Sequence, residues 1–241
     1  MMAGTLSIVG VGPGDPELIT LRAARLIGST PVVAYFCREK HPSQARTIAQ
    51  AHIGPATREM RLIYPFTTEV SVNDPAYHQN MSAFYDQSAE RLAEELAAGN
   101  DVTLLCEGDP FLYGSAMYVF DRLRTRCQTQ VVPGIMAMNG CWAQALAPMT
   151  HGDDVLCALP ATLPEAELAD WLERADAAVI MKIGRNMPHV RQAITRSGRM
   201  DEAVYVERGT QGAQVIAPMA EQDGKAPYFS LVLLPGRKRV R

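Results

Sequence analysis

Leu6-Ser7-Ile8-Val9-Gly10-Val11-Gly12-Pro13-Gly14-Asp15, near the start of the chain, is the stretch that decides the fold. Its apolar beginning predicts a buried strand, and the glycine–proline turn that follows opens toward a helix. Glycines at alternate positions let the backbone approach a ligand closely, because no Cβ atom stands in the way. A dinucleotide fingerprint would need a third glycine in place of Asp15, and Pro13 has no N–H to donate to a pyrophosphate. The turn therefore indicates a ligand loop of another kind.

The bulk composition is that of an ordinary globular protein. The chain has 241 residues, of which 47% are hydrophobic and 20% charged, and its net charge of −3 gives no sign of a nucleic-acid or membrane partner. Five scattered cysteines without a C-x-x-C pair argue against a disulfide framework and a zinc site, and the histidines show no metal-ligand spacing. No signal-peptide pattern and no apolar run of about 20 residues are found, which favours a cytoplasmic protein.

Predicted strands and helices alternate along the whole chain, which favours an α/β fold with mainly parallel or mixed sheets. We expect two αβα domains, residues 1–118 and 119–241. Asp74 and Pro75 predict the start of a long helix, as N-cap and first helical residue, and Gly99 its end. The predicted strands are residues 5–11, 31–36, 59–63, 102–106, 129–132, 155–159, 178–183, 203–207 and 228–234. The predicted helices are residues 20–27, 42–51, 75–96, 115–126, 135–147, 164–174 and 188–197.

Three strands of the first half run into loops rich in glycine and proline, namely loop 10–14, loop 106–114 and loop 132–137. Ligands of open α/β sheets bind beyond the carboxyl ends of the strands, so these loops could share one cleft. Each motif is weak alone, because Gly-Asp-Pro is a common turn and Pro-Gly before a helix a common bend. Their order and spacing together carry the argument.

In these loops the chain resembles the tetrapyrrole methylases, the class III S-adenosylmethionine-dependent methyltransferases. The family motifs are V-G-x-G-P-G with a following L-x-T, then G-D-P-x-x-Y/F-G, then V-V-P-G-I/V. Two later motifs, a strand followed by Met-Gly and a Glu-x-Gly-Thr turn, match more loosely. The matching residues are 9–14 with Leu18 and Thr20, 108–114, 131–135, 179–184 and 207–210.

The resemblance implies that S-adenosylmethionine lies in a cleft between two αβα domains of a homodimeric enzyme that has no metal. The implied acceptor is the C20 meso carbon of precorrin-2, which becomes precorrin-3A in cobalamin biosynthesis. Many family members have Ser or Thr where this chain has Met136, so only backbone contact remains there. The implied cofactor-binding residues are Pro13, Gly108, Asp109, Leu112, Met136, Ala137, Ile183 and Gly209.

A proton must leave the meso carbon after methylation, so a general base near it would help. Glu107 and Tyr113 lie in the right loop and are the candidate catalytic residues, with Glu107 preferred. Asp109 lies there too, and it could orient the cofactor or simply serve as a turn residue beside Pro110. The acetate and propionate arms of the substrate call for cations near strand ends. The candidates are Arg38, Lys40, Arg58, Arg61, Arg185 and Arg208.

Three alternatives stay open at this point. One is a related methyltransferase of the anaerobic pathway, which performs the same transfer on a cobalt-containing ring. It differs from the implied enzyme in its substrate. An NAD-dependent oxidoreductase is suggested by the strand–glycine turn and by Glu39 after the second predicted strand. A non-catalytic binding or scaffold protein could keep the same fold. Binding of S-adenosylhomocysteine rather than NAD, followed by transfer to a tetrapyrrole, would distinguish these possibilities.

Overall fold

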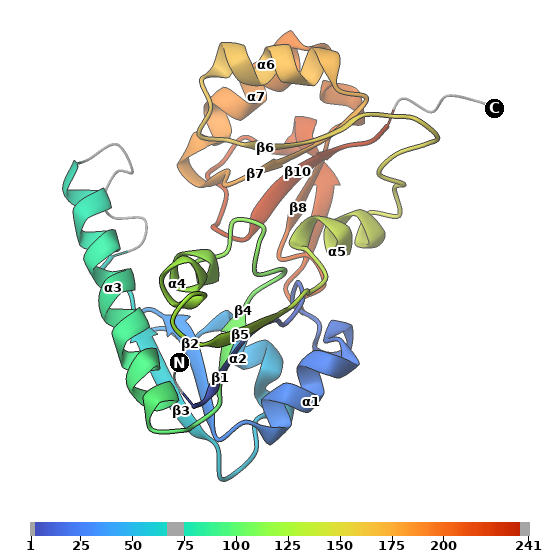
Figure 1. The fold of residues 1–241 in the computed structure, drawn as a ribbon. Coiled ribbons are helices and arrows are strands. Elements are labelled where there is room, and N and C mark those ends of the chain that lie inside the picture. Colours follow the sequence, from blue (N-terminus) through green and yellow to red (C-terminus); the bar gives the residue numbers. More distant parts are fainter. Residues whose placement is uncertain (1–2, 67–74, 237–241) are drawn as a thin grey trace. The chain divides into compact units, whose positions relative to one another are not determined.

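The computed structural model of the chain describes residues 3–66 and 75–236, so the N-cap predicted at Asp74 lies outside the described residues. The chain divides into two compact units, Met1–Ala137 and Met138–Arg241 (Figure 1). The boundary expected at residues 118/119 falls inside helix α4 (Ala116–Leu123). Because Val119 and Leu123 are buried in the core of the first unit, α4 and the strand after it belong to that unit.

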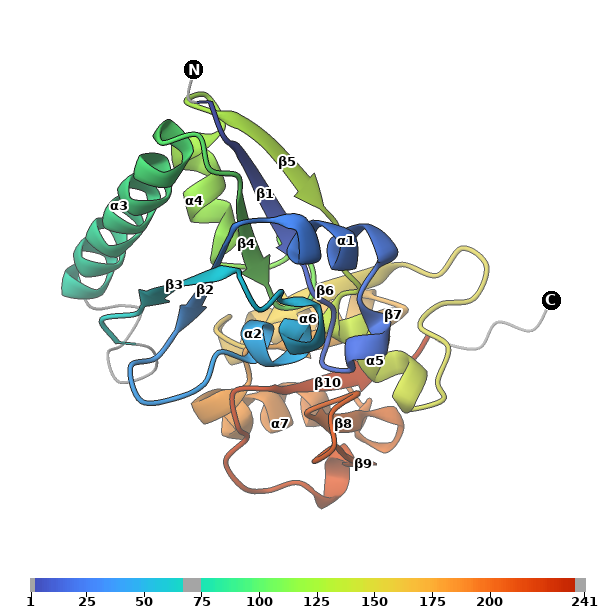
Figure 2. The same cartoon turned by 90° about the horizontal axis from the view of Figure 1, so that it is seen from below.

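The first unit is built on a five-stranded parallel sheet in the order β3-β2-β4-β1-β5 (Figure 2). The middle strand β4 and its neighbour β1 pair with Gly10 opposite Cys106, and β1 pairs with β5 with Val9 opposite Val132. The three glycine-rich loops therefore follow adjacent strands at the same end of the sheet, where the strands have their carboxyl ends. The strands are β1 (Thr5–Gly10), β2 (Val32–Cys37), β3 (Arg58–Ile63), β4 (Val102–Cys106) and β5 (Gln128–Val132).

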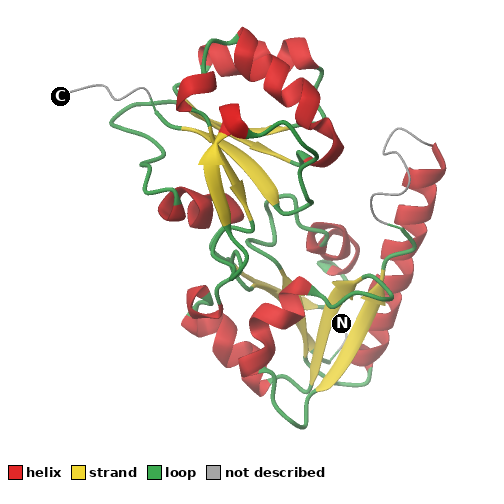
Figure 3. Cartoon of the chain, turned by 180° about the vertical axis from the view of Figure 1, so that it is seen from behind, coloured by secondary structure: helices red, strands yellow, loops and turns green. Residues whose placement is uncertain are grey.

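Helices cover both faces of this sheet (Figure 3). Helices α1 (Leu21–Ser29) and α2 (Gln44–Ala49) pack on one face, and α3 (Pro75–Ala97) and α4 on the other. The hydroxyl of Thr20 accepts the N–H of Ala23, which confirms the predicted cap of α1.

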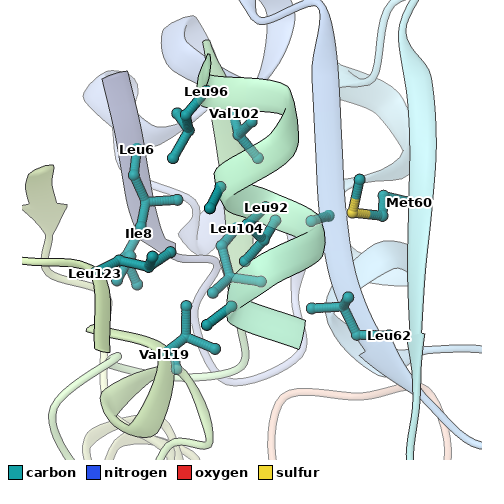
Figure 4. Packing of buried hydrophobic residues seen from close by; sticks show 14 of the residues in the cluster. Leu6, Ile8, Met60, Leu62, Leu92, Leu96, Val102, Leu104, Val119 and Leu123 are labelled. Carbon is teal, nitrogen blue, oxygen red and sulfur yellow. The ribbon is translucent and has the colours of Figure 1, made fainter. Parts of the chain in front are cut away.

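The face under α3 and α4 holds the larger core of the unit (Figure 4). Alternate residues of each strand point to it, such as Leu6 and Ile8 of β1, while Val9 points to the opposite face. Leu92 and Leu96 of α3 pack on these residues and are fully buried. Each such leucine contributes roughly 2 kcal/mol of burial free energy. This core stabilises the sheet whose carboxyl end carries the three loops.

The second unit contains a mixed five-stranded sheet in the order β6-β7-β10-β8-β9. Strands β6 and β7 are parallel, whereas β10 runs antiparallel to β7 and β8, and β9 antiparallel to β8. The sequence did not predict β9, a four-residue edge strand too short for a pattern of alternation. The strands are β6 (Leu156–Pro160), β7 (Ala177–Met181), β8 (Val204–Glu207), β9 (Val215–Pro218) and β10 (Ser230–Leu234).

Helices α6 (Glu165–Arg174) and α7 (Met187–Arg196) cover one face of the second sheet through a core that includes Leu168, Val190 and Val232. Helix α5 (Ala137–Gln144) leads into this unit from β5. The predicted α/β class with parallel and mixed sheets is confirmed. Short 3-10 helices lie at Pro16–Leu18, Gln50–His52, Gly184–Asn186, Met200–Glu202 and Met219–Glu221. In the part of the chain that the structure describes, no helix has the length and apolar character needed to cross a bilayer.

Candidate functional site

The three glycine-rich loops of the first unit interlock through their backbones. Gly12 and Gly108 exchange hydrogen bonds, with the Gly108 N–H at 2.8 Å from the Gly12 oxygen and the reverse bond at 3.4 Å. A Cβ atom on Gly10 would lie 2.6 Å from both the Gly108 oxygen and the Gly134 nitrogen, and one on Gly134 would overlap the Gly108 oxygen. These glycines are therefore needed for the packing of loop on loop, a structural reason beyond the close approach of a ligand.

This interlock brings together predicted cofactor-binding residues from different loops. Gly108 is buried with a φ of +61°, and a Cβ atom there would lie 3.5 Å from the Ala137 nitrogen and 3.8 Å from the Met136 Cα. Met136 and Ala137 are half-buried, and so are the three other predicted residues of this unit, Pro13, Asp109 and Leu112. The structure thus gathers Gly108, Met136 and Ala137 at the end of the sheet, although they lie far apart in the sequence.

Asp109 connects two of these loops. Its Oδ1 atom accepts the N–H of Phe111 at 2.9 Å within its own loop. Its Oδ2 atom accepts the N–H of Gly134 at 3.1 Å, across to loop 132–137. Both carboxylate oxygens are thus engaged by backbone donors, an arrangement that the sequence did not reveal.

Glu107 is the first residue beyond β4, and burial raises its pKa from 4.5 to about 7. The N–H of Ala45 donates to its carboxylate and opposes that rise. Such a carboxyl group can change its protonation near neutral pH, as a general base requires. Tyr113, the other candidate, is 40% exposed and has a φ of +56°.

The thiol of Cys106, next to Glu107, is buried at the end of β4. Burial, and then the charge of Glu107, raise its pKa to about 12. The sulfur therefore stays protonated, and as a neutral thiol it is a poor nucleophile.

In the second unit the turn after β8 carries the predicted Gly209. Gly209 is buried against the sulfur of Cys141 on α5, and its N–H donates to that sulfur. Glu207 accepts hydrogen bonds from Tyr205 at 3.2 Å and from Arg208 at 2.6 Å. Burial raises the pKa of Tyr205 to about 12, so its hydroxyl stays a donor. The contact with Cys141 and the hydrogen bonds of Glu207 therefore hold this turn in place.

Ile183 differs from the other predicted residues because its side chain is fully buried in the core of the second unit. Its neighbours Lys182 and Gly184 have φ values of +59° and +44°. In the described residues, the non-glycine residues with positive φ are Tyr113, Leu146, Lys182, Arg208 and Thr210. All but Leu146 lie in the motifs that resemble the family, and backbone strain of this kind concentrates at functional sites.

Several of the candidate cations have partners in the protein. Arg58 forms an ion pair with Glu95, and Arg208 forms one with Glu207. Arg61 donates to the backbone oxygen of Glu39 at 2.9 Å and so holds the loop after β2. Arg38, Lys40 and Arg185 are exposed.

Ser115, directly after loop 106–114, is a residue that the sequence analysis missed. Its Oγ atom lies 2.7 Å from the hydroxyl of Tyr64 and 3.0 Å from that of Tyr85. Both rings belong to an aromatic cluster with Phe36 and Phe84. The partners come from β3's end and from α3, so only its position beside the Gly-Asp-Pro motif could have drawn attention to Ser115. Among the described residues no cluster of His, Cys, Asp or Glu is arranged to hold a metal ion.

An α/β frame with glycine-rich loops at the carboxyl ends of adjacent strands is the arrangement of a ligand-binding α/β protein. The family model described as Tetrapyrrole (Corrin/Porphyrin) Methylases matches residues 5–222. The chain therefore belongs to the tetrapyrrole methylases, as its motifs indicated.

Curated relatives include a precorrin-2 methyltransferase and a cobalt-precorrin-2 methyltransferase. The precorrin-2 C(20)-methyltransferase of Sinorhizobium sp is 49% identical over 98% of this chain and 96% of its own length. The cobalamin biosynthesis protein CobIJ of Mycobacterium tuberculosis is 44% identical over 98% of this chain, which spans only 47% of that protein. The cobalt-precorrin-2 C(20)-methyltransferase of Salmonella typhimurium is 27% identical, with 97% of each chain covered.

Solved structures share the fold. A cobalt precorrin-4 methyltransferase superposes with a TM-score of 0.73 at 21% identity, covering 96% of this chain and 94% of the other. A uroporphyrin-III C-methyltransferase from Thermus thermophilus, in complex with S-adenosylhomocysteine, gives a TM-score of 0.67 at 23% identity, with 96% and 92% covered. At these identities the likeness concerns the fold alone.

Proposed function

We propose that this protein transfers a methyl group from S-adenosylmethionine to the C20 meso carbon of precorrin-2, giving precorrin-3A in cobalamin biosynthesis. One observation carries the proposal: the 49% identity to the Sinorhizobium precorrin-2 C(20)-methyltransferase, which extends over nearly the full length of both chains. The cobalt-precorrin-2 enzyme of Salmonella has 27% identity over a similar length, so the metal-free substrate is favoured over the cobalt-containing one. An NAD-dependent oxidoreductase is not favoured, because the family is that of methylases.

The residues at the sheet edge fit an S-adenosylmethionine site. Gly108 leaves open backbone where a side chain would stand, and the half-buried Leu112, Met136 and Ala137 offer apolar surface to an adenosine group. When bound, S-adenosylmethionine supplies an electrophilic methyl group and leaves as S-adenosylhomocysteine. In our proposal Pro13, Gly108, Leu112, Met136 and Ala137 hold it from the first unit. For Ile183 and Gly209 of the second unit, the same role stays a prediction.

The chain's own chemical contribution is small and specific. The C20 carbon forms the new bond to the methyl group and then releases a proton, and we assign its uptake to the carboxylate of Glu107. With a pKa of about 7, Glu107 is a stronger base than an ordinary carboxylate, yet it is largely ionised just above neutral pH. Alignment of carbon and methyl group supplies the larger part of the rate, since well-oriented reactants gain about 7–11 kcal/mol. Tyr113 is the second candidate for the proton, on the exposed side of the same loop.

A homodimeric assembly and a cytoplasmic location also stay predictions. The family resemblance supports the first, and the composition, with its unpaired cysteines, supports the second. Light scattering on the purified protein gives the assembly directly, and a mass of one chain would contradict the dimer.

The experiment that tests the function supplies methyl-labelled S-adenosylmethionine and precorrin-2 under anaerobic conditions. We expect one label per tetrapyrrole, on the C20 carbon in the NMR spectrum of the product. Cobalt-precorrin-2, supplied in parallel at the same concentration, should be methylated far more slowly. A preference for the cobalt ring would contradict the assignment of the substrate, and transfer to neither ring would contradict the function.

A further inference from the structure

The carboxylate of Asp109 connects the two loops that bear most of the proposed cofactor-binding residues. Loop 106–114 contains Gly108 and Leu112, and loop 132–137 contains Met136 and Ala137. The bond from the Gly134 N–H to Oδ2 of Asp109 joins the two loops by a side chain, at 3.1 Å. The bond from the Phe111 N–H to Oδ1, at 2.9 Å, fixes that side chain within its own loop.

From this arrangement we infer that Asp109 is a positioning residue, which sets the spacing of the two loops and does not bind the charged amino-acid portion of the cofactor. The inference rests on the proposed function, since the ligand it concerns is S-adenosylmethionine. A carboxylate that accepts two backbone N–H groups is fixed in orientation and already has part of its charge balanced. Gly134 itself is locked against Gly10 and Gly108, so a shift of its N–H would move the whole interlock.

The opposite end of the same sheet contains a matched control. Asp101, just before β4, accepts the N–H of Thr5 at the start of β1 through Oδ1 at 2.7 Å. It is again an aspartate that joins two segments through a backbone N–H, but at the amino ends of the strands, away from the loops. A loss of this bond costs stability without changing the spacing of the loops.

Two substitutions separate the contacts of Asp109. Asp109→Asn keeps the shape but turns one acceptor into an NH2 donor, which must then face a backbone N–H. Asp109→Ser keeps an oxygen for the Phe111 N–H, as in a local serine turn, and is too short to reach Gly134. If Asp109→Asn does not fold, Asp109→Ser still removes the bond between the loops.

The test measures the affinity of each variant for S-adenosylhomocysteine and for 5′-methylthioadenosine, which lacks the amino-acid portion, by calorimetry below the unfolding transition. We expect the affinity of both Asp109 variants to fall about tenfold or more, and by the same factor for both ligands. A tenfold loss of affinity corresponds to about 1.4 kcal/mol. Asp101→Asn should bind both like the wild type. In the methylation assay, Asp109→Ser should raise the KM for S-adenosylmethionine, whereas a mere loss of folded protein would lower kcat and leave KM unchanged.

Other results would overturn the inference. A loss for S-adenosylhomocysteine without a loss for methylthioadenosine would mean that Asp109 contacts the amino-acid portion directly. Wild-type affinity of both Asp109 variants for both ligands would mean that Asp109 neither sets the spacing of the loops nor contacts the amino-acid portion. If the wild-type protein itself binds neither ligand, the proposed function fails first, and that failure is distinguishable because it needs no variant.

Discussion

The sulfur of Cys141 on α5 occupies the space that a Cβ atom of residue 209 would need. Gly209 is buried against it, and the Gly209 N–H donates to the sulfur. Burial raises the pKa of the Cys141 thiol to about 12, so the contact is that of a neutral thiol. The sizes of residues 141 and 209 are therefore coupled.

This coupling predicts the outcome of a double-mutant cycle. Gly209→Ala should lower the free energy of unfolding by about 1–3 kcal/mol, because the new methyl group meets the sulfur. Cys141→Ala in the same chain should recover part of that loss, since the Cα atom of residue 141 would still be 3.4 Å from the added Cβ atom. Urea unfolding of both single variants and the double variant measures the coupling. Strictly additive changes in the free energy of unfolding would contradict the coupling. A cofactor role of Gly209 can be tested only in a variant whose packing has been restored.

The raised pKa of Glu107 predicts a pH-dependent difference between the wild type and Glu107→Gln. The folded state favours the protonated carboxyl, so its contribution to stability is complete below pH 4.5 and is lost as the pH rises through about 7. Glutamine mimics the protonated form and can still accept the Ala45 N–H. Above pH 8 we expect Glu107→Gln to be more stable than the wild type by roughly 2 kcal/mol. Thermal unfolding from pH 4 to 9 measures this, and parallel stability curves would argue against a buried carboxyl group.

The same variant tests the catalytic role of Glu107. We expect the methylation rate of the wild type to rise through pH 7 as the carboxyl ionises, and Glu107→Gln to be slower by about 10²-fold or more without that rise. Tyr113→Phe, made in parallel, should retain most of the activity. The reverse pattern, in which Tyr113→Phe is slow and Glu107→Gln is not, would assign the proton to Tyr113.

The interlock of loops predicts that Gly134→Ala damages both stability and ligand binding. The new Cβ atom would overlap the Gly108 oxygen, a backbone atom that cannot rotate away. We expect a loss of about 3 kcal/mol and no measurable affinity for S-adenosylhomocysteine. Gly212→Ala is the control, because a Cβ atom there meets nothing within 4 Å. Wild-type binding by Gly134→Ala would show that the loops can separate without consequence.

Arg199 should be the most sensitive of the second unit's arginines to substitution. It is 5% exposed, and its guanidinium donates to the backbone oxygens of Leu172, Ala175, Asp176 and Pro235 while it pairs with Glu202. Arg199→Met leaves these carbonyls without a donor, so we expect a loss of about 3–5 kcal/mol in urea unfolding.

The control for Arg199 is Arg196, which is half exposed. Its nitrogens lie 3.9 and 4.0 Å from the carboxylates of Glu165 and Asp170. Arg196→Ala should change stability by less than about 0.5 kcal/mol. Equal losses at both positions would mean that burial and hydrogen bonding do not distinguish the two residues.

Much of the fold could be predicted from local sequence patterns. β4 was predicted at its observed bounds, and Thr20 at its observed cap, because both depend on neighbouring residues only. The extent of the first unit could not be predicted in this way. Whether Val119 and Leu123 belong to one core or another depends on partners from β1 and α3, which lie far away in the sequence.

The candidate site divides along the same line. The glycine motifs and the carboxyl group of Glu107 could be found by their types and positions. The bond from Gly134 to Asp109 and the sulfur beneath Gly209 could not, because each joins segments whose proximity only the sheet order creates. Ser115 is a similar case, since its tyrosine partners come from two other elements.

The interlock of Gly10, Gly108 and Gly134 also governs when the ligand loops can form. Their strands are neighbours in space, but β1 and β4 are separated in the chain by β2, β3 and the helices α1, α2 and α3, and β4 and β5 are separated by α4. Such non-local contacts form late in folding, after the cost of closing the long loops between them has been met. A nascent chain that ends before β5 would lack the loop that holds Gly134. Ligand affinity should thus not appear before the last strand of the first unit has formed, so that S-adenosylhomocysteine binding reports that this strand is in place.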